Sequence, residues 1–230
     1  MKIALFAKSN DKQTLDSLDI LLKNLQSKHT LVIEKKFLEN ASVANTGNSF
    51  EEISTFSHLD ETFNLLISLG GDGTILRTVS LVQDLNIPIV GINTGRLGFL
   101  ANIQPNEIKE ALSEILDNDF KISERTIITV TTSCNHNKIE NNSYALNEIA
   151  VSRKNTTSMI NINTKLNGEY LNSYWADGLI IATPTGSTGY SLSCGGPVIS
   201  SNTPTLAITP IAPHNLNARP IIISDDTEIK

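Results

Sequence analysis

Apolar residues in the first hundred positions fall into short runs separated by segments with helical spacing. The runs 2–7, 30–33, 62–69 and 86–92 are short and apolar, which is typical of buried strands. Segment 11–26 carries leucines at helical spacing, and the residues after the third run show the same period. Strands that alternate with helices predict a parallel sheet covered by helices, so we expect a Rossmann-like α/β fold here.

Other parts of this half are less regular. Segment 34–49 is polar and contains Asn and Gly, which predicts a loop, and 50–56 is expected to form a short helix. Pro105 suits the first turn of a helix that runs to Leu116.

The pattern changes after Asp117, where short β-branched runs dominate. Asn167-Gly168 predicts a tight hairpin, and 135–142 a looser hairpin loop. We therefore expect a predominantly β, sandwich-like second domain, and we place the domains at 1–103 and 104–230. The expected β segments are 120–132, 143–152, 159–166, 169–175, 179–183, 205–209 and 219–223.

Composition narrows the function classes. The 230-residue chain has a net charge of -6, which argues against a general nucleic-acid binder. No apolar run approaches the roughly 20 residues of a membrane helix, and the start is too short for a signal peptide. Cys134 and Cys194 are expected to be buried thiols of a cytoplasmic protein, and no His/Cys spacing suggests a metal site.

A glycine-rich turn, Gly70-Gly71-Asp72-Gly73-Thr74, joins the third apolar run to a helical pattern. Free backbone N–H groups and a positive helix end at such a turn suit phosphate, and glycines allow close approach. A carboxylate beside phosphate is repulsive unless a cation or a proton transfer uses it, which makes Asp72 a candidate catalytic group. The alternative is a plain βα turn in which Asp72 caps the helix.

The second half holds two polar stretches of interest. Asn147-Glu148 interrupts an apolar run, where Glu148 can accept hydrogen bonds from sugar hydroxyls; the alternative is a bulge with both side chains in water. Segment 176–197 is rich in Gly, Ser and Thr, so an extended polar ligand can lie along it, and Tyr190 can stack on a base. The alternative is an ordinary surface loop. We assign no catalytic role to His214.

Together these stretches resemble the NAD kinase family. The matching pieces are the glycine turn, Asn93-Thr94-Gly95-Arg96-Leu97-Gly98-Phe99, Asn147-Glu148, the block from Asp177-Gly178 to Gly195-Gly196-Pro197, and Pro210-Ile211-Ala212-Pro213-His214 with Arg219-Pro220. The resemblance implies phosphorylation of the adenosine ribose 2′-hydroxyl of NAD by ATP with Mg²⁺ or another divalent cation. It also implies an N-terminal α/β domain that handles the phosphate donor, a β-rich NAD-binding domain, and a homodimer or homotetramer.

The same resemblance implies residue roles. Asp72 falls on the catalytic base, with Gly73 beside it at the substrate, and Arg77 is placed to help a phosphate. Asn147 and Glu148 fall on residues that grip ribose hydroxyls, and Asp177 on one that reaches the nicotinamide end, often in a neighbouring subunit. The remaining positions implied at NAD are Phe99, Thr185, Thr188, Gly189, Tyr190, Ser191, Leu192, Ser193 and Ala212, and those at phosphate are Gly70, Gly71, Gly73 and Thr74.

Two departures from the family pattern stand out. Gly189 replaces an alanine that many members have, which makes the loop roomier. The family continues for several tens of residues, so we expect the second domain to be truncated after Lys230 and the strand 220–224 to present an unpaired edge.

Two other functions fit parts of the sequence. A diacylglycerol- or sphingosine-type lipid kinase shares the glycine turn, but it does not explain the polar segment 183–193. A non-catalytic sensor that binds NAD or NADP accounts for the same motifs without turnover.

Overall fold

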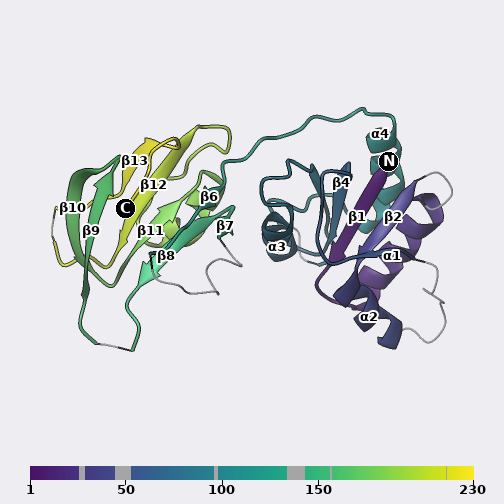
Figure 1. The fold of residues 1–230 in the computed structure, drawn as a ribbon, viewed down its shortest axis with the longest axis horizontal. Coiled ribbons are helices and arrows are strands. Elements are labelled where there is room, and N and C mark those ends of the chain that lie inside the picture. The colour runs from purple at the N-terminus through teal and green to yellow at the C-terminus, as the bar shows by residue number, and fades with distance from the viewer. Residues whose placement is uncertain (26–28, 45–52, 96–97, 134–142, 156, 216) are drawn as a thin grey trace. The chain divides into compact units, whose positions relative to one another are not determined.

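The chain folds into two compact units. The computed structural model describes residues 1–230 except 26–28, 45–52, 96–97, 134–142, 156 and 216. The first unit is Met1–Ile122 and the second is Ser123–Lys230 (Figure 1), and each has its own hydrophobic core. Within the part of the chain that the structure describes, no helix combines the length and apolar character needed to cross a membrane.

The first unit is a five-stranded parallel sheet with helices on its faces, which confirms the expected α/β fold. The strand order is β3-β2-β1-β4-β5. Strands β2 and β3 therefore lie on one side of β1, and the chain then crosses to the other side of β1 to form β4 and β5. The elements are β1 (Lys2–Ala7), α1 (Lys12–Leu25), β2 (Thr30–Glu34), α2 (Lys35–Ala44), β3 (Thr55–Phe56), β4 (Leu65–Leu69), α3 (Asp72–Val82), β5 (Ile89–Ile92), the 3-10 turn η1 (Pro105–Glu107) and α4 (Ile108–Leu116).

Both faces of this sheet are buried. Alternate residues such as Ile3 and Leu5 pack with the leucines of α1 and with α4. Ala4 and Leu66 point the other way, into a cluster that includes Val82 at the end of α3. All five residues of β4 are buried, which explains its continuous apolar sequence and fixes the place where the glycine turn begins.

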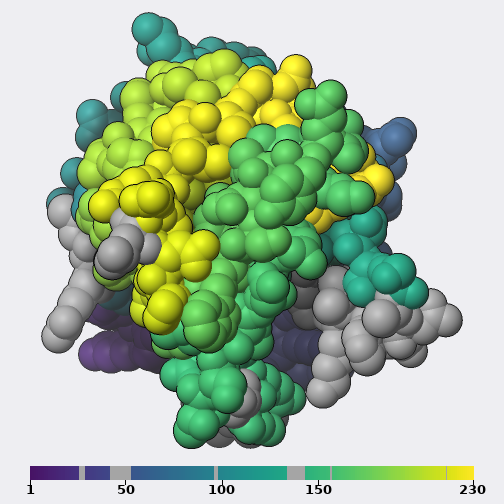
Figure 2. All heavy atoms as spheres, turned by 90° about the vertical axis from the view of Figure 1, so that its left-hand side faces the viewer, coloured from purple at the N-terminus to yellow at the C-terminus, as the bar shows by residue number. Residues whose placement is uncertain are grey.

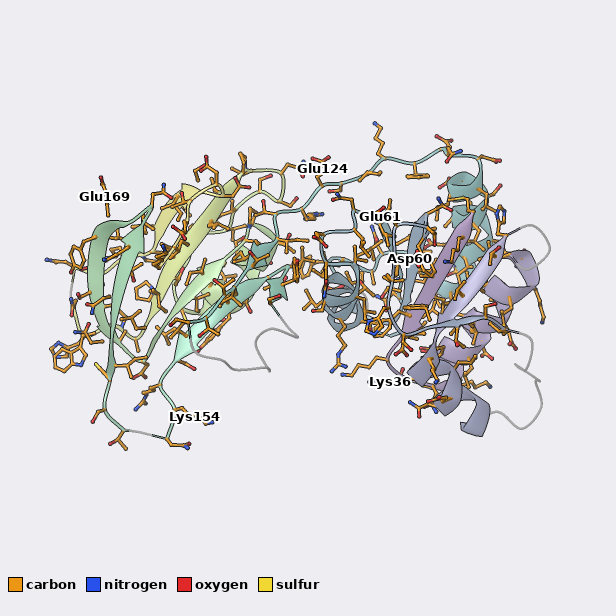
Figure 3. All side chains as sticks on the ribbon, viewed as in Figure 1. Lys36, Asp60, Glu61, Glu124, Lys154 and Glu169 are labelled. Carbon is orange, nitrogen blue, oxygen red and sulfur yellow. The ribbon has the colours of Figure 1, made fainter. Side chains whose placement is uncertain are left out.

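Two expectations for the first unit are wrong. Segment 35–44, expected within a loop, is helix α2, whose Phe37, Leu38 and Ala41 are buried while Lys36 is exposed (Figure 3). The Glu34 carboxylate accepts the N–H of Phe37 at 2.6 Å and so caps the helix. Thr55–Phe56, expected in a short helix, is strand β3 paired with β2; residues 45–52 lie outside the described part.

The second unit is built from antiparallel strands, as expected. A four-stranded sheet has the order β13-β12-β11-β8, and β9 pairs with β10 through a turn in which Asn167 and Gly168 both have positive φ. The predicted tight hairpin is confirmed; the predicted loop 135–142 lies outside the described residues. The strands are β6 (Ile128–Thr129), β7 (Tyr144–Ala145), β8 (Glu148–Ser152), β9 (Ile160–Leu166), β10 (Glu169–Ala176), β11 (Gly178–Ala182), β12 (Thr205–Ile211) and β13 (Ile221–Ser224).

The last residues lie against the β9–β10 hairpin, yellow beside green in Figure 2. Lys165 and Lys230 exchange backbone hydrogen bonds of 2.7 and 3.0 Å, and Ile229 joins the core formed by Tyr174 and Leu179. β13 forms one edge of the four-stranded sheet.

Helix α4 belongs to the first unit. Its Ile108, Leu112 and Ile115 are buried in the same core as α1, because the apolar stripe of α4 needs a partner surface. The two units meet in sequence between Ile122 and Ser123, whereas a boundary near residue 103 assigns this helix to the second domain.

Replacing Ile108 by Ala should destabilise the first unit by about 2–5 kcal/mol, because the side chain is fully buried. Urea unfolding followed by the helical circular-dichroism signal measures this. The neighbouring Lys109→Ala, at an exposed position of the same helix, should stay within about 0.5 kcal/mol of the parent. Equal stability of both variants would contradict the assignment of α4 to this core.

Candidate functional site

The glycine turn lies at the carboxyl end of β4, beside β1, where the strand order reverses. Open α/β sheets bind ligands at this point. Gly70 has φ +145, and a Cβ there would lie 2.2 Å from the Thr74 hydroxyl oxygen, so both backbone and space require glycine. Gly71 is the N-cap of α3 and provides no side chain to cap it. The first N–H groups of α3 therefore face outward at its positive end, which suits an anion.

Asp72 is held by the backbone of a distant loop. Its Oδ2 accepts the N–H of Phe99 at 2.7 Å, and its Oδ1 accepts those of Leu100 at 2.9 Å and Ala101 at 3.0 Å. Burial alone would raise the pKa of this carboxyl, but the three backbone donors outweigh it and hold the pKa below its ordinary value. Asp72 is therefore ionised at neutral pH. It is the first residue within α3, so the interpretation as a helix cap does not account for its contacts.

The other candidate residues of the first unit differ in how exposed they are. Gly73 is exposed with open space beside it, Thr74 is buried, and Arg77 is exposed one turn further along α3. The Phe99 side chain is 91% exposed although its N–H is bound to Asp72, which leaves a flat apolar ring facing outward. Arg96 and Leu97 of the same motif lie outside the described residues.

In the second unit, Glu148 begins β8 and is partly desolvated. Burial raises the pKa of its carboxyl above the ordinary value, and its Oε2 is buried with no hydrogen-bond partner among the described residues. The hydroxyl of Thr185 is unpaired in the same sense. Buried polar atoms are nearly always hydrogen-bonded, so both oxygens are available to a ligand that donates to them; Ser68, Thr164 and Thr205 carry such oxygens elsewhere in the described residues. A Cβ at Gly189 would lie 3.4 Å from Glu148 Oε2, so the loop carrying Gly189 approaches this carboxylate.

Thr183 ties this loop to Asn147. Its N–H donates to the Asn147 carbonyl oxygen at 2.8 Å, and its hydroxyl donates to the Leu146 carbonyl oxygen and accepts the Gly186 N–H at 3.1 Å. Gly186 lies so close that a Cβ there would be 2.0 Å from the Asn147 oxygen. The Asn147-Glu148 pair and the following turn are thus one packed assembly, which an exposed bulge would not be.

The polar segment after β11 forms a 3-10 turn, η2 (Thr185–Thr188), and a helical turn, α6 (Tyr190–Ser193). Tyr190 and Leu192 are 45% and 44% exposed, and Thr188, Gly189 and Ser193 are exposed as well. Ser191 differs from the expectation: it is fully buried, and its hydroxyl hydrogen-bonds that of Thr209 at 2.8 Å, so it supports the segment from below.

Asp177 and Ala212 lie at the other end of β11. Gly178 pairs with Ser152 and Ala182 pairs with Glu148, so Asp177 is five residues along the strand from the position opposite Glu148, about 17 Å. Within this unit the structure therefore does not bring Asp177 to Glu148. The Asp177 carboxylate pairs with Arg153, with Nε 3.0 Å from Oδ1, and Ala212 has φ +43, an uncommon backbone conformation for alanine.

The sequence predicted the site side chains but not the residues that hold them in place, such as Gly98 and Thr183. Both belong to motifs that were singled out. The glycine next to Phe99 was the signal that could have pointed to the close approach at residue 98. Cys194 is a free thiol, as expected, but it is only partly buried, and Cys134 lies outside the described residues. In the described ranges no three His, Cys, Asp or Glu side chains gather into a set that could hold a metal ion.

Comparison with known proteins gives a consistent result. Residues 3–120 match the family model described as the ATP-NAD kinase N-terminal domain, and residues 146–230 match the ATP-NAD kinase C-terminal domain. NAD kinases of Flavobacterium psychrophilum and Christiangramia forsetii are 52% and 50% identical over the whole chain, which spans 79% of the length of each. Yeast NADH kinase complexed with NADH has a TM-score of 0.82 at 28% identity, covering all of this chain and 71% of its own. An Archaeoglobus fulgidus NAD kinase in complex with ATP has a TM-score of 0.72 at 29% identity, covering all of this chain and 79% of its own.

The raised pKa of Glu148 makes stability depend on pH. At pH values above 4.5, the ordinary pKa of a Glu carboxyl, the folded chain still holds a proton on Glu148 that the unfolded chain has lost. The stability of the fold therefore falls as the pH rises from 4.5 through the raised pKa of the folded state. Glu148→Gln removes that loss, so its stability relative to the parent should increase between about pH 4 and about pH 7. Thermal unfolding across this range measures it.

Glu169, exposed at the start of β10 (Figure 3), provides the control, because Glu169→Gln removes the same charge from the surface of the same unit. If the stability difference between Glu148→Gln and the parent equals that between Glu169→Gln and the parent at every pH, burial of Glu148 does not make stability depend on pH.

Proposed function

This chain belongs to the ATP-NAD kinase family, and from that premise we propose that it transfers the terminal phosphoryl group of ATP to the 2′-hydroxyl of the adenosine ribose of NAD, giving NADP. The observation that carries the proposal is the ionised Asp72 at the glycine turn, fixed by three backbone donors beside a helix N-terminus. This is the pairing of a proton acceptor with a phosphate cradle that phosphoryl transfer to a hydroxyl requires.

One oxygen of Asp72 is better suited to take the proton. A carboxylate oxygen has two lone pairs, and both on Oδ1 are used by the N–H groups of Leu100 and Ala101. Oδ2 accepts only the Phe99 N–H among the described residues and keeps one lone pair for the ribose hydroxyl, at about 2.6–3.2 Å in a productive complex. Because the transition state of phosphoryl transfer is loose, a carboxylate of low pKa is sufficient to orient the hydroxyl and accept its proton.

The phosphate groups of ATP are assigned to the glycine turn. The N–H groups of Gly71 and Gly73 and the positive end of α3 are available to phosphate oxygens, with Gly70 shaping the approach and Arg77 one turn along the helix. A divalent cation such as Mg²⁺, held mainly by ATP oxygens and water, would neutralise phosphate charge. Mg²⁺ usually keeps several waters and binds through substrate phosphates, so this arrangement leaves the remaining lone pair of Asp72 to the ribose hydroxyl.

The residues proposed to contact NAD are considered in each unit separately. Asn147 and Glu148 are proposed to bind ribose hydroxyls, since Glu148 Oε2 and the Thr185 hydroxyl have no hydrogen-bond partner within the described part of the chain. Phe99 and Tyr190 offer exposed rings for the adenine. Asp177 is proposed to contact the nicotinamide end in a neighbouring subunit of a homodimer or homotetramer, and Ala212 is proposed as a small residue beside NAD. The cytoplasm is the proposed compartment. The exposed positions of the polar segment, Thr188, Gly189, Leu192 and Ser193, complete the proposed NAD surface.

A coupled assay of NADP formation with ATP, Mg²⁺ and NAD tests the function, run on this chain and on the complete gene product. NADP from either protein supports the kinase. Folded protein that binds NAD but forms no NADP in either case would favour a sensor, and phosphorylation of diacylglycerol or sphingosine instead would favour a lipid kinase.

Asp72→Asn should lower kcat by about 10²–10⁴ while NAD binding is retained, because only the proton acceptor is lost. The carboxamide can keep the two bonds at Oδ1 and loses the one from Phe99. Calorimetry of NAD binding and the coupled assay give the two readouts. Asp84→Asn, an exposed position just after α3, is the matched control and should retain parental activity. Full turnover by Asp72→Asn would refute the assignment of Asp72 as the base.

A further inference from the structure

Gly98 makes an unusually close approach to the carboxylate that the mechanism uses. A Cβ at this position would lie 2.2 Å from Asp72 Oδ1, 2.4 Å from Cγ and 2.6 Å from Oδ2. Separations below 3.0 Å are essentially absent between real Cβ atoms and their neighbours. The space that a side chain at residue 98 would occupy is therefore already filled by the Asp72 carboxylate.

Backbone conformation does not explain this glycine. Gly98 is absent from the described glycines with positive φ, which are Gly70, Gly168 and Gly195. An alanine could adopt the same backbone, so the requirement for glycine at 98 arises from the occupied space.

The loop cannot easily move back to make room. Its far end is anchored, because the Asn93 amide donates to the Ala101 carbonyl oxygen at 3.2 Å and the Asn93 N–H donates to that of Ile103 at 2.8 Å. Ala101 is fully buried, and its Cα lies 2.9 Å from where a Cβ of Gly91 would be. With this end fixed, a methyl group at residue 98 would displace the Asp72 carboxylate instead.

We propose that Gly98 is a positioning residue for phosphoryl transfer: its missing side chain lets the backbone of residues 98–101 close over Asp72 and direct Oδ2 at the ribose hydroxyl. The inference rests on the proposed role of Asp72 as the base. Gly98 itself touches no reacting atom and acts through the three N–H donors that follow it in sequence.

Gly98→Ala should lower kcat by about 10²-fold, since a displacement of about 1 Å costs that much in catalysis, and leave the KM for NAD nearly unchanged. Loss of backbone donors should raise the pKa of Asp72, so the acid limb of the kcat–pH profile should move to higher pH. A role in folding alone would not move this limb.

Gly95→Ala is the matched control in the same loop, because among the described residues a Cβ there meets only Asn93 Oδ1 at 3.9 Å. It should keep the parental kcat and pH profile. Parental values for Gly98→Ala as well would overturn the proposal.

The Asp72→Asn protein separates this inference from the proposed function. If Gly98 acts through Asp72, adding Gly98→Ala to Asp72→Asn should cause little further loss, so the two effects are not additive. If Asp72→Asn is inactive but Gly98→Ala is fully active, the inference about Gly98 is wrong and the kinase assignment stands. If Asp72→Asn is fully active, Asp72 is not the base, and the premise of the inference is wrong as well.

If Gly98→Ala does not fold, thermal unfolding of the double variant with Asp72→Ala decides. Removing the carboxylate opens the space, so the double variant should be about as stable as Asp72→Ala alone. A double variant that remains as unstable as Gly98→Ala would show that the carboxylate is not what the methyl group meets.

Discussion

The first unit depends on three backbone N–H groups converging on one carboxylate. Asp72 joins the start of α3 to the segment after β5, and so connects two strand ends that are neighbours in the sheet but far apart in sequence. The contact is possible because β4 is fully buried and cannot shift, because Gly70 turns the chain sharply, and because Gly98 leaves room. Charge-assisted hydrogen bonds of this kind are stronger than neutral ones, and here they order the site before any ligand arrives.

In the second unit, the environment of Glu148 shifts the pKa of its carboxyl in the opposite direction. Three backbone donors lower the pKa of Asp72, whereas partial burial raises the pKa of Glu148, whose Oε2 finds no hydrogen-bond partner in the described ranges. When their environments shift the pKa values of two carboxyl groups in opposite directions, the two groups are suited to different chemical tasks. A satisfied carboxylate stays ionised and fixed, while an unsatisfied one gains most from a hydroxyl that donates to it. Each unit thus contains one carboxylate of a different kind: a fixed, ionised one in the first unit and an incompletely bonded one in the second.

Local patterns predicted most of the fold and the chemically important side chains. The leucines of α1, the glycine turn and Asn167-Gly168 each carry their signal within a few residues. Helix α2 was missed because its apolar stripe is short and its cap, Glu34, is an unusual capping residue. The supports of the site were missed for another reason: Phe99 is 27 residues from Asp72, and Thr209 is 18 residues from Ser191. Such pairings exist only once the strands are placed, so no window of sequence contains them.

Phe99 combines an exposed ring with a backbone N–H that is bound to the carboxylate of Asp72. The ring belongs to the residue whose N–H is bonded to Oδ2, and the ring itself is 91% exposed. The ring can rotate about its side-chain torsions without moving this N–H, so a ligand can reorient the ring while the carboxylate stays fixed. One residue therefore fixes the carboxylate through its backbone and leaves its side chain free to contact a ligand.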